Sequence, residues 1–168
     1  NDVHGNILTP RLAYKWAITK NDIFRINAGT GFRVVNLFTE DHAALTGARE
    51  VIVKEKLKPE QSYNVNANYI KKKYLDNGGS GSIELSGWYT YFTNVIFPDY
   101  ETNANQIVYD NLDGSAVTKG LSINADWTLH NGFSFMLGGT LMDVSTIEDD
   151  IKERQVLTER FTGTWSVS

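Results

Sequence analysis

Residues 23 to 38 read IFRINAGTGFRVVNLF. Residues 24 to 33 alternate with a period of two, which is typical of a β-strand with two faces of different character. Phe24, Ile26 and Phe32 lie on an apolar face, and Arg25 and Arg33 lie on a polar face. The alternation ends at a dense apolar run, VVNLF at 34 to 38, which is followed by acidic residues and a histidine. The sequence therefore predicts a strand that leaves its regular environment near residue 34.

The same period of two recurs along most of the chain and predicts an all-β fold. We expect about seven strands, at roughly 9 to 18, 23 to 33, 61 to 74, 82 to 96, 117 to 129, 133 to 143 and 157 to 168. The parity of the fifth strand is also compatible with an extension back through Ile107 and Tyr109.

The connections alternate in length. Those at 19 to 22, 76 to 81 and 130 to 132 are short and rich in turn residues, whereas those at 34 to 60, 97 to 116 and 144 to 156 are long. In an antiparallel up-and-down meander, all the long connections then lie at one end of the sheet. This asymmetry is typical of outer-membrane barrels, which have short periplasmic turns and long extracellular loops.

The polar faces consist mainly of Ser, Thr, Asn and Gly, and the apolar faces carry aromatic residues toward their ends. Aromatic side chains that fit interfacial girdles are Tyr14, Trp16, Tyr63, Tyr69, Trp127 and Trp165. The charged residues of the apolar faces, among them Lys71, Lys73 and Lys119, are expected near strand ends, where a long side chain reaches water at little cost. These patterns favour a membrane barrel, but a soluble β-sandwich or lipocalin-like barrel with its apolar faces inward stays open.

Composition excludes several other classes of protein. The 168 residues suffice for one domain, and no apolar run is long enough for a transmembrane helix. The net charge of −4 argues against a nucleic-acid partner. The chain has no cysteine, so disulfides and thiolate chemistry are excluded. No signal peptide is recognisable at NDVHGNIL, and both ends fall inside the alternating pattern, which predicts a fragment of a larger protein.

Four segments, in this order, resemble TonB-dependent outer-membrane receptors: TPRLA at 9 to 13, GFRVVNLF at 31 to 38, LKPEQSY at 57 to 63, and NLDG at 111 to 114 followed by TKGL at 118 to 121. Together they span most of the chain. One departure is Val35, where the family often has proline.

The resemblance implies a 22-stranded transmembrane β-barrel, plugged by an N-terminal domain, of which this chain would be a partial barrel segment spanning residues 1 to 168. It implies uptake of a scarce nutrient such as an iron-siderophore, haem, cobalamin or a glycan, driven by the TonB complex across a Gram-negative outer membrane. The plug and the strands that close the barrel would lie outside this chain. A seven-strand piece cannot close, so we expect an open sheet or edge-to-edge contact with a copy.

Ligand-binding candidates follow from the long loops, because loop tips and the nearby lumen wall supply such groups. They are Arg33, Asn36, Glu40, Asp41, His42, Arg49 and Tyr100. Arg25, lower on the polar face, is a candidate for contact with the plug. The histidines at 4, 42 and 130 have no metal-ligand spacing, and no nucleophile–base arrangement is recognisable. We therefore expect no metal, no cofactor and no enzyme. The alternative function is a soluble ligand- or carbohydrate-binding β domain, which solubility as a folded monomer without detergent would favour.

Overall fold

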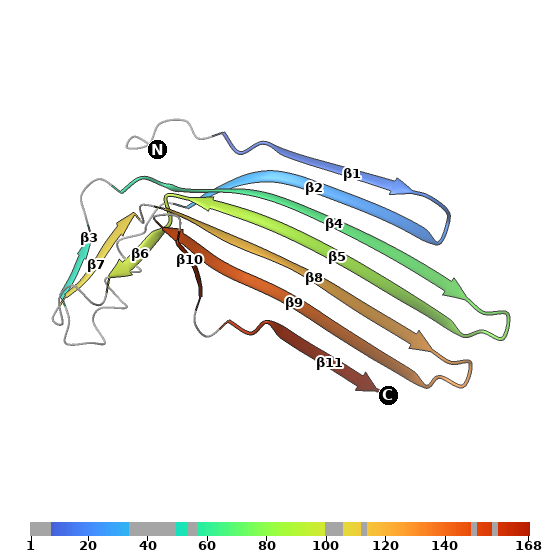
Figure 1. The fold of residues 1–168 in the computed structure, drawn as a ribbon. Coiled ribbons are helices and arrows are strands. Elements are labelled where there is room, and N and C mark those ends of the chain that lie inside the picture. The colour runs from blue at the N-terminus through green and yellow to red at the C-terminus, as the bar shows by residue number, and fades with distance from the viewer. Residues whose placement is uncertain are drawn as a thin grey trace.

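A computed structural model describes residues 8–33, 50–53, 57–99, 106–111, 114–148, 151–155 and 158–168, and all regular elements in these ranges are β-strands (Figure 1). Seven long strands form an antiparallel meander, so the predicted fold class is confirmed. They are β1 Arg11–Ala17, β2 Asp22–Arg33, β4 Glu60–Tyr74, β5 Ser80–Thr93, β8 Gly114–Thr128, β9 Ser134–Glu148 and β11 Phe161–Val167. Within the described ranges, no helix is long and apolar enough to cross a membrane.

Four short strands lie inside segments that we expected as loops: β3 Glu50–Val53, β6 Ile96–Asp99, β7 Gln106–Asn111 and β10 Ile151–Arg154. β3, β7 and β6 form a separate small sheet, in which β3 and β7 are parallel. The suggested extension of the fifth strand through residues 107 and 109 is therefore wrong, because these residues belong to β7. β9 continues to Glu148, beyond its expected end at 143, because β10 turns back and pairs with its last four residues.

The short turns all lie at one end of the main sheet, the turn end, and the longer connections lie at the other, the loop end (Figure 1). Two of these turns contain a glycine with φ of 85°, Gly78 and Gly132, a left-handed conformation that only glycine adopts without strain. Each of these turns is closed by backbone hydrogen bonds, from Leu75 to Gly79 and from Leu129 to Phe133. The alternation of short and long connections thus follows from local turn chemistry.

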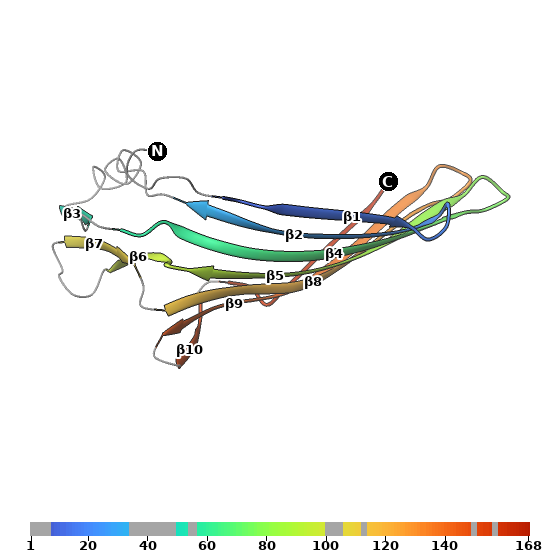
Figure 2. The ribbon, with the colours of Figure 1, turned by 90° about the horizontal axis from the view of Figure 1, so that it is seen from above.

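The main sheet is open. β1 pairs with β2, and β11 pairs with β9 below β10, while no pairing joins β1 to β11 in the described strands. The two strands lie at opposite edges of a curved, twisted sheet (Figures 1 and 2). This agrees with the expectation that seven strands do not close a barrel.

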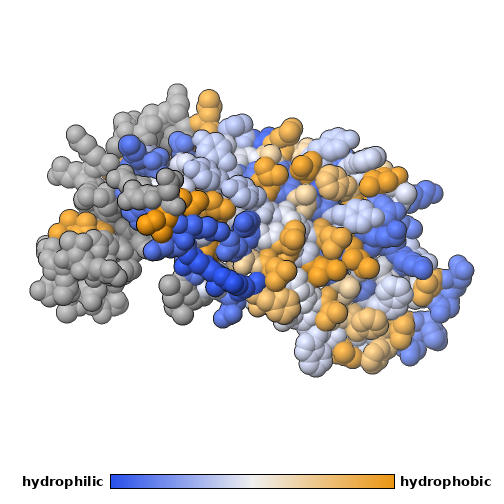
Figure 3. Space-filling model, in the orientation of Figure 1, coloured by the Kyte–Doolittle hydropathy of each residue, from blue (hydrophilic) through white to orange (hydrophobic). Residues whose placement is uncertain are grey.

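Neither face of the sheet has a protein core. Among the described residues, only Ile96 and Val117 are buried apolar side chains. One face, here called the apolar face, exposes large hydrophobic residues such as Leu121 at 64%, Leu137 at 64% and Phe161 at 63%. Hydrophobic residues gather over the middle of the strands in Figure 3, with hydrophilic residues toward both ends. An apolar surface this extensive requires a partner, because water is a poor solvent for it.

The uncharged stretch of the apolar face runs obliquely across the strands, and we call it the apolar band. On β2 it begins at Phe24, the next residue of this face after Asp22, and is described as far as Phe32, the last residue of this face in the strand. Beside β8 it begins at Phe133, immediately before β9, and ends at Leu141, the last residue of this face before Asp143. The strand register places Leu141 level with Ile26, through Leu121, Gly87 and Ala67, so the loop-side limit shifts by six residues, from 32 to 26.

The turn-side limit of the apolar band shifts by the same amount. On β4, the residue level with Phe24 is Tyr69, and the residue level with Phe135 is Lys73, four residues further toward the turn end. Phe133 lies two residues beyond Phe135, so the total shift is again six residues. Six residues over four strand pairings give about 1.5 residues per strand. At ~3.3 Å per residue and ~4.8 Å between strands, the strands cross the band at about 45°.

Candidate functional site

The loop end of the polar face is organised by an ion pair between Arg33, the last residue of β2, and Glu60, the first of β4. The register aligns the two residues, and the contact is bidentate, with Nε–Oε2 at 2.5 Å and Nη2–Oε1 at 3.0 Å. Glu60 Oε1 also accepts a hydrogen bond from the backbone N–H of Ile96 at 2.8 Å. The Arg33 side chain is 61% exposed and that of Glu60 is 13% exposed, so Glu60 anchors an arginine that faces the loop end.

Asn111, the last residue of β7, joins two other segments at the same end. Its side-chain amide donates to the backbone carbonyls of Asn94 at 2.8 Å and Lys58 at 3.0 Å, and its Oδ1 accepts from the Lys58 N–H at 2.7 Å. Asn94 follows β5 and has a positive φ of 53°, a conformation that asparagine tolerates better than most residues. We call Lys58, Glu60, Asn94, Ile96 and Asn111 the loop-base clamp.

The clamp connects segments that are far apart in the sequence. Arg33 lies in GFRVVNLF, Lys58 and Glu60 lie in LKPEQSY, and Asn111 begins NLDG. The Thr30 N–H also donates to the carbonyl of Pro10, in TPRLA, at 3.1 Å. All four segments on which the sequence resemblance rested therefore contribute to the loop end or to the strands beneath it. Sequence reasoning missed Glu60 and Asn111 as site residues, although they stand inside two of those segments.

Below the loop end, the polar face carries a ladder of small polar side chains. Asn27 Nδ2 donates to Asn66 Oδ1 at 2.9 Å, and Asn68 Nδ2 donates to Glu84 Oε1 at 2.5 Å and Ser86 Oγ at 2.9 Å. Such cross-strand pairs stabilise a sheet by roughly 0.2–1 kcal/mol each. The ladder makes this face a polar wall.

Arg25 projects from the same wall. The register places it between Lys15 of β1 and Asn68 of β4, three residues from the start of β2 at the turn end, and it is exposed. It lies eight residues before Arg33 on the same strand and face, so the two arginines lie near opposite ends of β2. A role for Arg25 in contacting a plug stays a prediction.

Trp88 is a large aromatic residue on this polar face and was not singled out from the sequence. It shares a row with Asn66, Gly120 and Met142. A Cβ added to Gly120 would lie 2.3 Å from Trp88 Cζ2, so the indole ring lies directly against the Gly120 backbone. A depression of about 560 Å³ is lined by Trp88, Gly120, Met142 and Arg160, among others. The signal in the sequence was a tryptophan at a polar-face position of β5.

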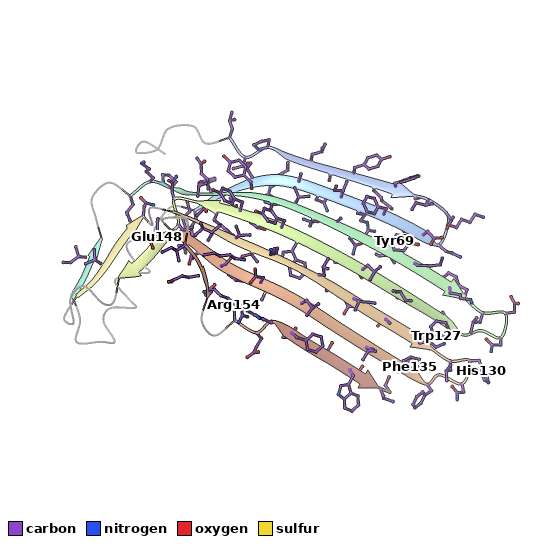
Figure 4. The ribbon with its side chains drawn as sticks, in the orientation of Figure 1. Tyr69, Trp127, His130, Phe135, Glu148 and Arg154 are labelled. Carbon is purple, nitrogen blue, oxygen red and sulfur yellow. The ribbon has the colours of Figure 1, made fainter. Side chains whose placement is uncertain are left out.

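The remaining predicted ligand-binding residues lie outside the described ranges: Asn36, Glu40, Asp41, His42, Arg49 and Tyr100. Their roles stay predictions. The described part of the chain holds no group of three His, Cys, Asp or Glu side chains that would suit a metal ion. Figure 4 shows Arg154 and Glu148 at the loop end of the sheet, opposite Trp127, His130 and Phe135 near the turn end.

Comparison with known proteins gives one family. Residues 1–165 match the family model described as TonB dependent receptor-like, beta-barrel. No curated protein matches the chain.

Proposed function

The chain belongs to the TonB-dependent receptor β-barrel family, and from this premise we propose that its sheet is part of the wall of an outer-membrane receptor that takes up a scarce nutrient. The family is one of transporters of Gram-negative outer membranes rather than of enzymes. The proposal covers the location of this chain, its lipid-facing and lumen-facing sides, and the residues that meet plug and ligand.

The observation that carries the proposal is the oblique apolar band. The two surfaces of a bilayer are parallel planes, so they cut tilted strands at residues that shift steadily from one strand to the next. Strands of outer-membrane barrels tilt by about 35–45°, which fits the angle of about 45° at which the strands cross the band. Lipid then replaces the missing core beneath the apolar face, and the polar face lines the lumen.

We assign the polar face to contact with a plug domain of the same receptor. Its asparagine and serine ladder offers donors and acceptors to a hydrated partner, and Arg25 adds an exposed positive charge toward the turn end of the wall. The TonB complex would act through the plug, since energised transport requires the plug to move.

We assign ligand contact to the loop end. Arg33 lies at the lumen side of this end, held by Glu60, and the chain continues from it into the segment with Asn36, Glu40, Asp41, His42 and Arg49. Tyr100 lies in the next long connection. The loop-base clamp ties the bases of these connections together, which gives a binding surface on loops a rigid support. An iron-siderophore, haem, cobalamin or a glycan is the class of ligand expected.

The test uses two neighbouring residues of β8 that lie on opposite faces. Single cysteines are introduced at Leu121 and at Ser122, and are spin-labelled in the intact receptor in bilayers. We expect the label at 121 to collide with oxygen dissolved in the lipid, and the label at 122 to be shielded from lipid. A label at 121 that is protected from both lipid and water would place the apolar face in a protein core and support the soluble alternative.

A further inference from the structure

The apolar face carries one group of charged side chains at the loop-side limit of the band. Asp143 of β9 accepts from Lys152 Nζ of β10 at 3.0 Å, and Lys119 Nζ of β8 lies 4.0 Å from the same carboxylate oxygen. Lys119 and Lys152 are each 52% exposed. We call Lys119, Lys152 and Arg154, gathered around Asp143, the cation cluster.

Lys119 was expected near a strand start, but it lies five residues into β8, which begins at Gly114. The oblique course of the apolar band explains this position. Leu121 and Leu141 are the last apolar residues of the band on β8 and β9, and Lys119 and Asp143 are the next residues on the same face. Two residues along a strand span about 7 Å, so the charged groups begin where the apolar band ends.

The cation cluster is not neutralised by its own carboxylate. Arg154 also acts electrostatically on Asp143, and one of its terminal nitrogens donates to the Thr158 carbonyl, which fixes the guanidinium nearby. Three cations therefore surround Asp143. A second carboxylate of this face is Glu159, which the register of β11 places level with Asp143, so the three cations exceed the two carboxylates by one charge. The neighbouring carboxylates Glu148 and Glu153 pair with Gly114 and Thr146, positions of the opposite parity, so they face away from the cluster.

An apolar groove adjoins the cation cluster. It has a volume of about 610 Å³ and is lined by Leu85, Leu121, Ile123, Leu141 and Phe161, among others. Gly87 and Gly139 lie at its floor, where a Cβ on Gly139 would meet nothing closer than 3.6 Å. Leu121 and Leu141 line the groove and are also the residues next to Lys119 and Asp143, so groove and cluster are continuous.

We propose that this surface binds an anionic phosphorylated lipid of the loop-side leaflet, with the phosphate between Lys119 and Lys152 and an acyl chain in the groove. The inference rests on the proposed membrane function, because only a bilayer brings such a molecule to this face. Charge complementarity selects the occupant: ammonium and guanidinium groups form strong charge-assisted hydrogen bonds with phosphate. Basic residues near a membrane surface each favour anionic lipid. A neutral lipid would fill the groove but leave the excess positive charge unpaired.

The test measures lipid retention by the intact receptor, delipidated in non-ionic detergent, by native mass spectrometry. The probes are diphosphoryl lipid A, phosphatidylglycerol, phosphatidylcholine and inorganic phosphate. We expect a phosphorylated lipid to bind the wild-type protein, and binding to weaken at least about tenfold in the double variant Lys119→Gln/Lys152→Gln. Gly139→Leu, which fills the groove without removing charge, should also weaken lipid binding but leave the weak binding of inorganic phosphate unchanged.

The matched control is Lys20→Gln/Lys72→Gln, which removes two charges from the first turn and the polar face and should leave lipid retention unchanged. The proposal is overturned if the Lys119/Lys152 variant retains wild-type affinity, if the control loses as much, or if the zwitterionic phosphatidylcholine binds as tightly as the anionic lipids. It is also overturned if inorganic phosphate displaces the lipid completely at equal concentration. If the label at 121 contacts lipid but lipid retention is unchanged when the two lysines are replaced, this inference alone fails. If that label avoids lipid, the proposed function fails.

Discussion

Ile123 and Ser122 are neighbours in β8, yet they lie on sheet faces of opposite character. Ile123 is half exposed on the apolar band, whereas Ser122 lies on the polar wall, level with Asn68 and Ser86. Neither side chain packs into a protein core. The exposed fraction of a side chain therefore does not distinguish the two faces of the sheet. The residue types that line up across neighbouring strands do distinguish them.

The largest effect expected from breaking this comparison is that of Ile123→Arg. A charge near the bilayer midplane costs about 2–4 kcal/mol, so the free energy of unfolding of the intact barrel in lipid vesicles should fall by about that amount. Urea titration of the vesicle-inserted protein measures the change. Ser122→Arg, one residue away on the polar face, should cost less than ~1 kcal/mol. Similar costs for the two variants would refute the assignment of the faces.

A second, smaller effect compares two glycines. A Cβ at Gly120 would lie 2.3 Å from Trp88 Cζ2 and 2.7 Å from the backbone oxygen of Leu141. Gly120→Ala should therefore displace the Trp88 ring and destabilise the barrel by about 1–3 kcal/mol. The readouts are urea unfolding and the emission wavelength of Trp88.

Gly163→Ala on β11 is the matched control for Gly120, because its nearest neighbour would be Phe161 at an ordinary 3.6 Å. This variant should change the unfolding free energy by well under ~1 kcal/mol. If both alanines were equally harmless, the close contact between Trp88 and Gly120 would not exist in the folded protein.

The smallest effect concerns the first turn. A hydrogen bond from Thr19, together with one from the Tyr69 hydroxyl and the charge of Lys71, lowers the pKa of Asp22 from its usual 3.8. A lowered pKa in the folded state means that the carboxylate contributes stability above the unfolded value, and that this contribution is lost as pH falls through the folded value. Unfolding measured between pH 5 and 2, over about the range in which carboxyl groups titrate, should show this loss.

Two variants isolate the contribution of Asp22. Asp22→Asn should remove its part of the pH dependence, and Thr19→Val should move that part toward higher pH. An unchanged pH profile in both variants would contradict the assignment.

The arrangement of strands was largely predictable because each strand reports its own alternation. All seven expected strands are present, and the asymmetry of the connections follows from turn residues such as Gly78 and Gly132. The boundaries at the loop end were less predictable. There, β9 continues and β10 pairs with it over residues that read as a polar connection, since backbone hydrogen bonding does not require an apolar side-chain pattern.

The candidate site was predictable only in part. Arg33 was placed at the loop end from its position on β2, but its partner Glu60 is 27 residues away in the sequence. The link from Asn111 to Lys58 and Asn94 crosses 53 and 17 residues. A periodic pattern contains no information about such pairs, because they depend on which strand ends meet.

The sequence by itself determined the strands, their two faces, the ends at which turns and loops lie, and the resemblance to the receptor family. These features are local or depend on parity, so each segment carries its own signal. The tertiary structure decided the register, and with it the oblique apolar band, the loop-base clamp, and the place of Lys119 beside Asp143 and Lys152. Register is a relation between strands, set by pairing along their full lengths, and only that relation places a charge within a strand at the limit of the apolar band.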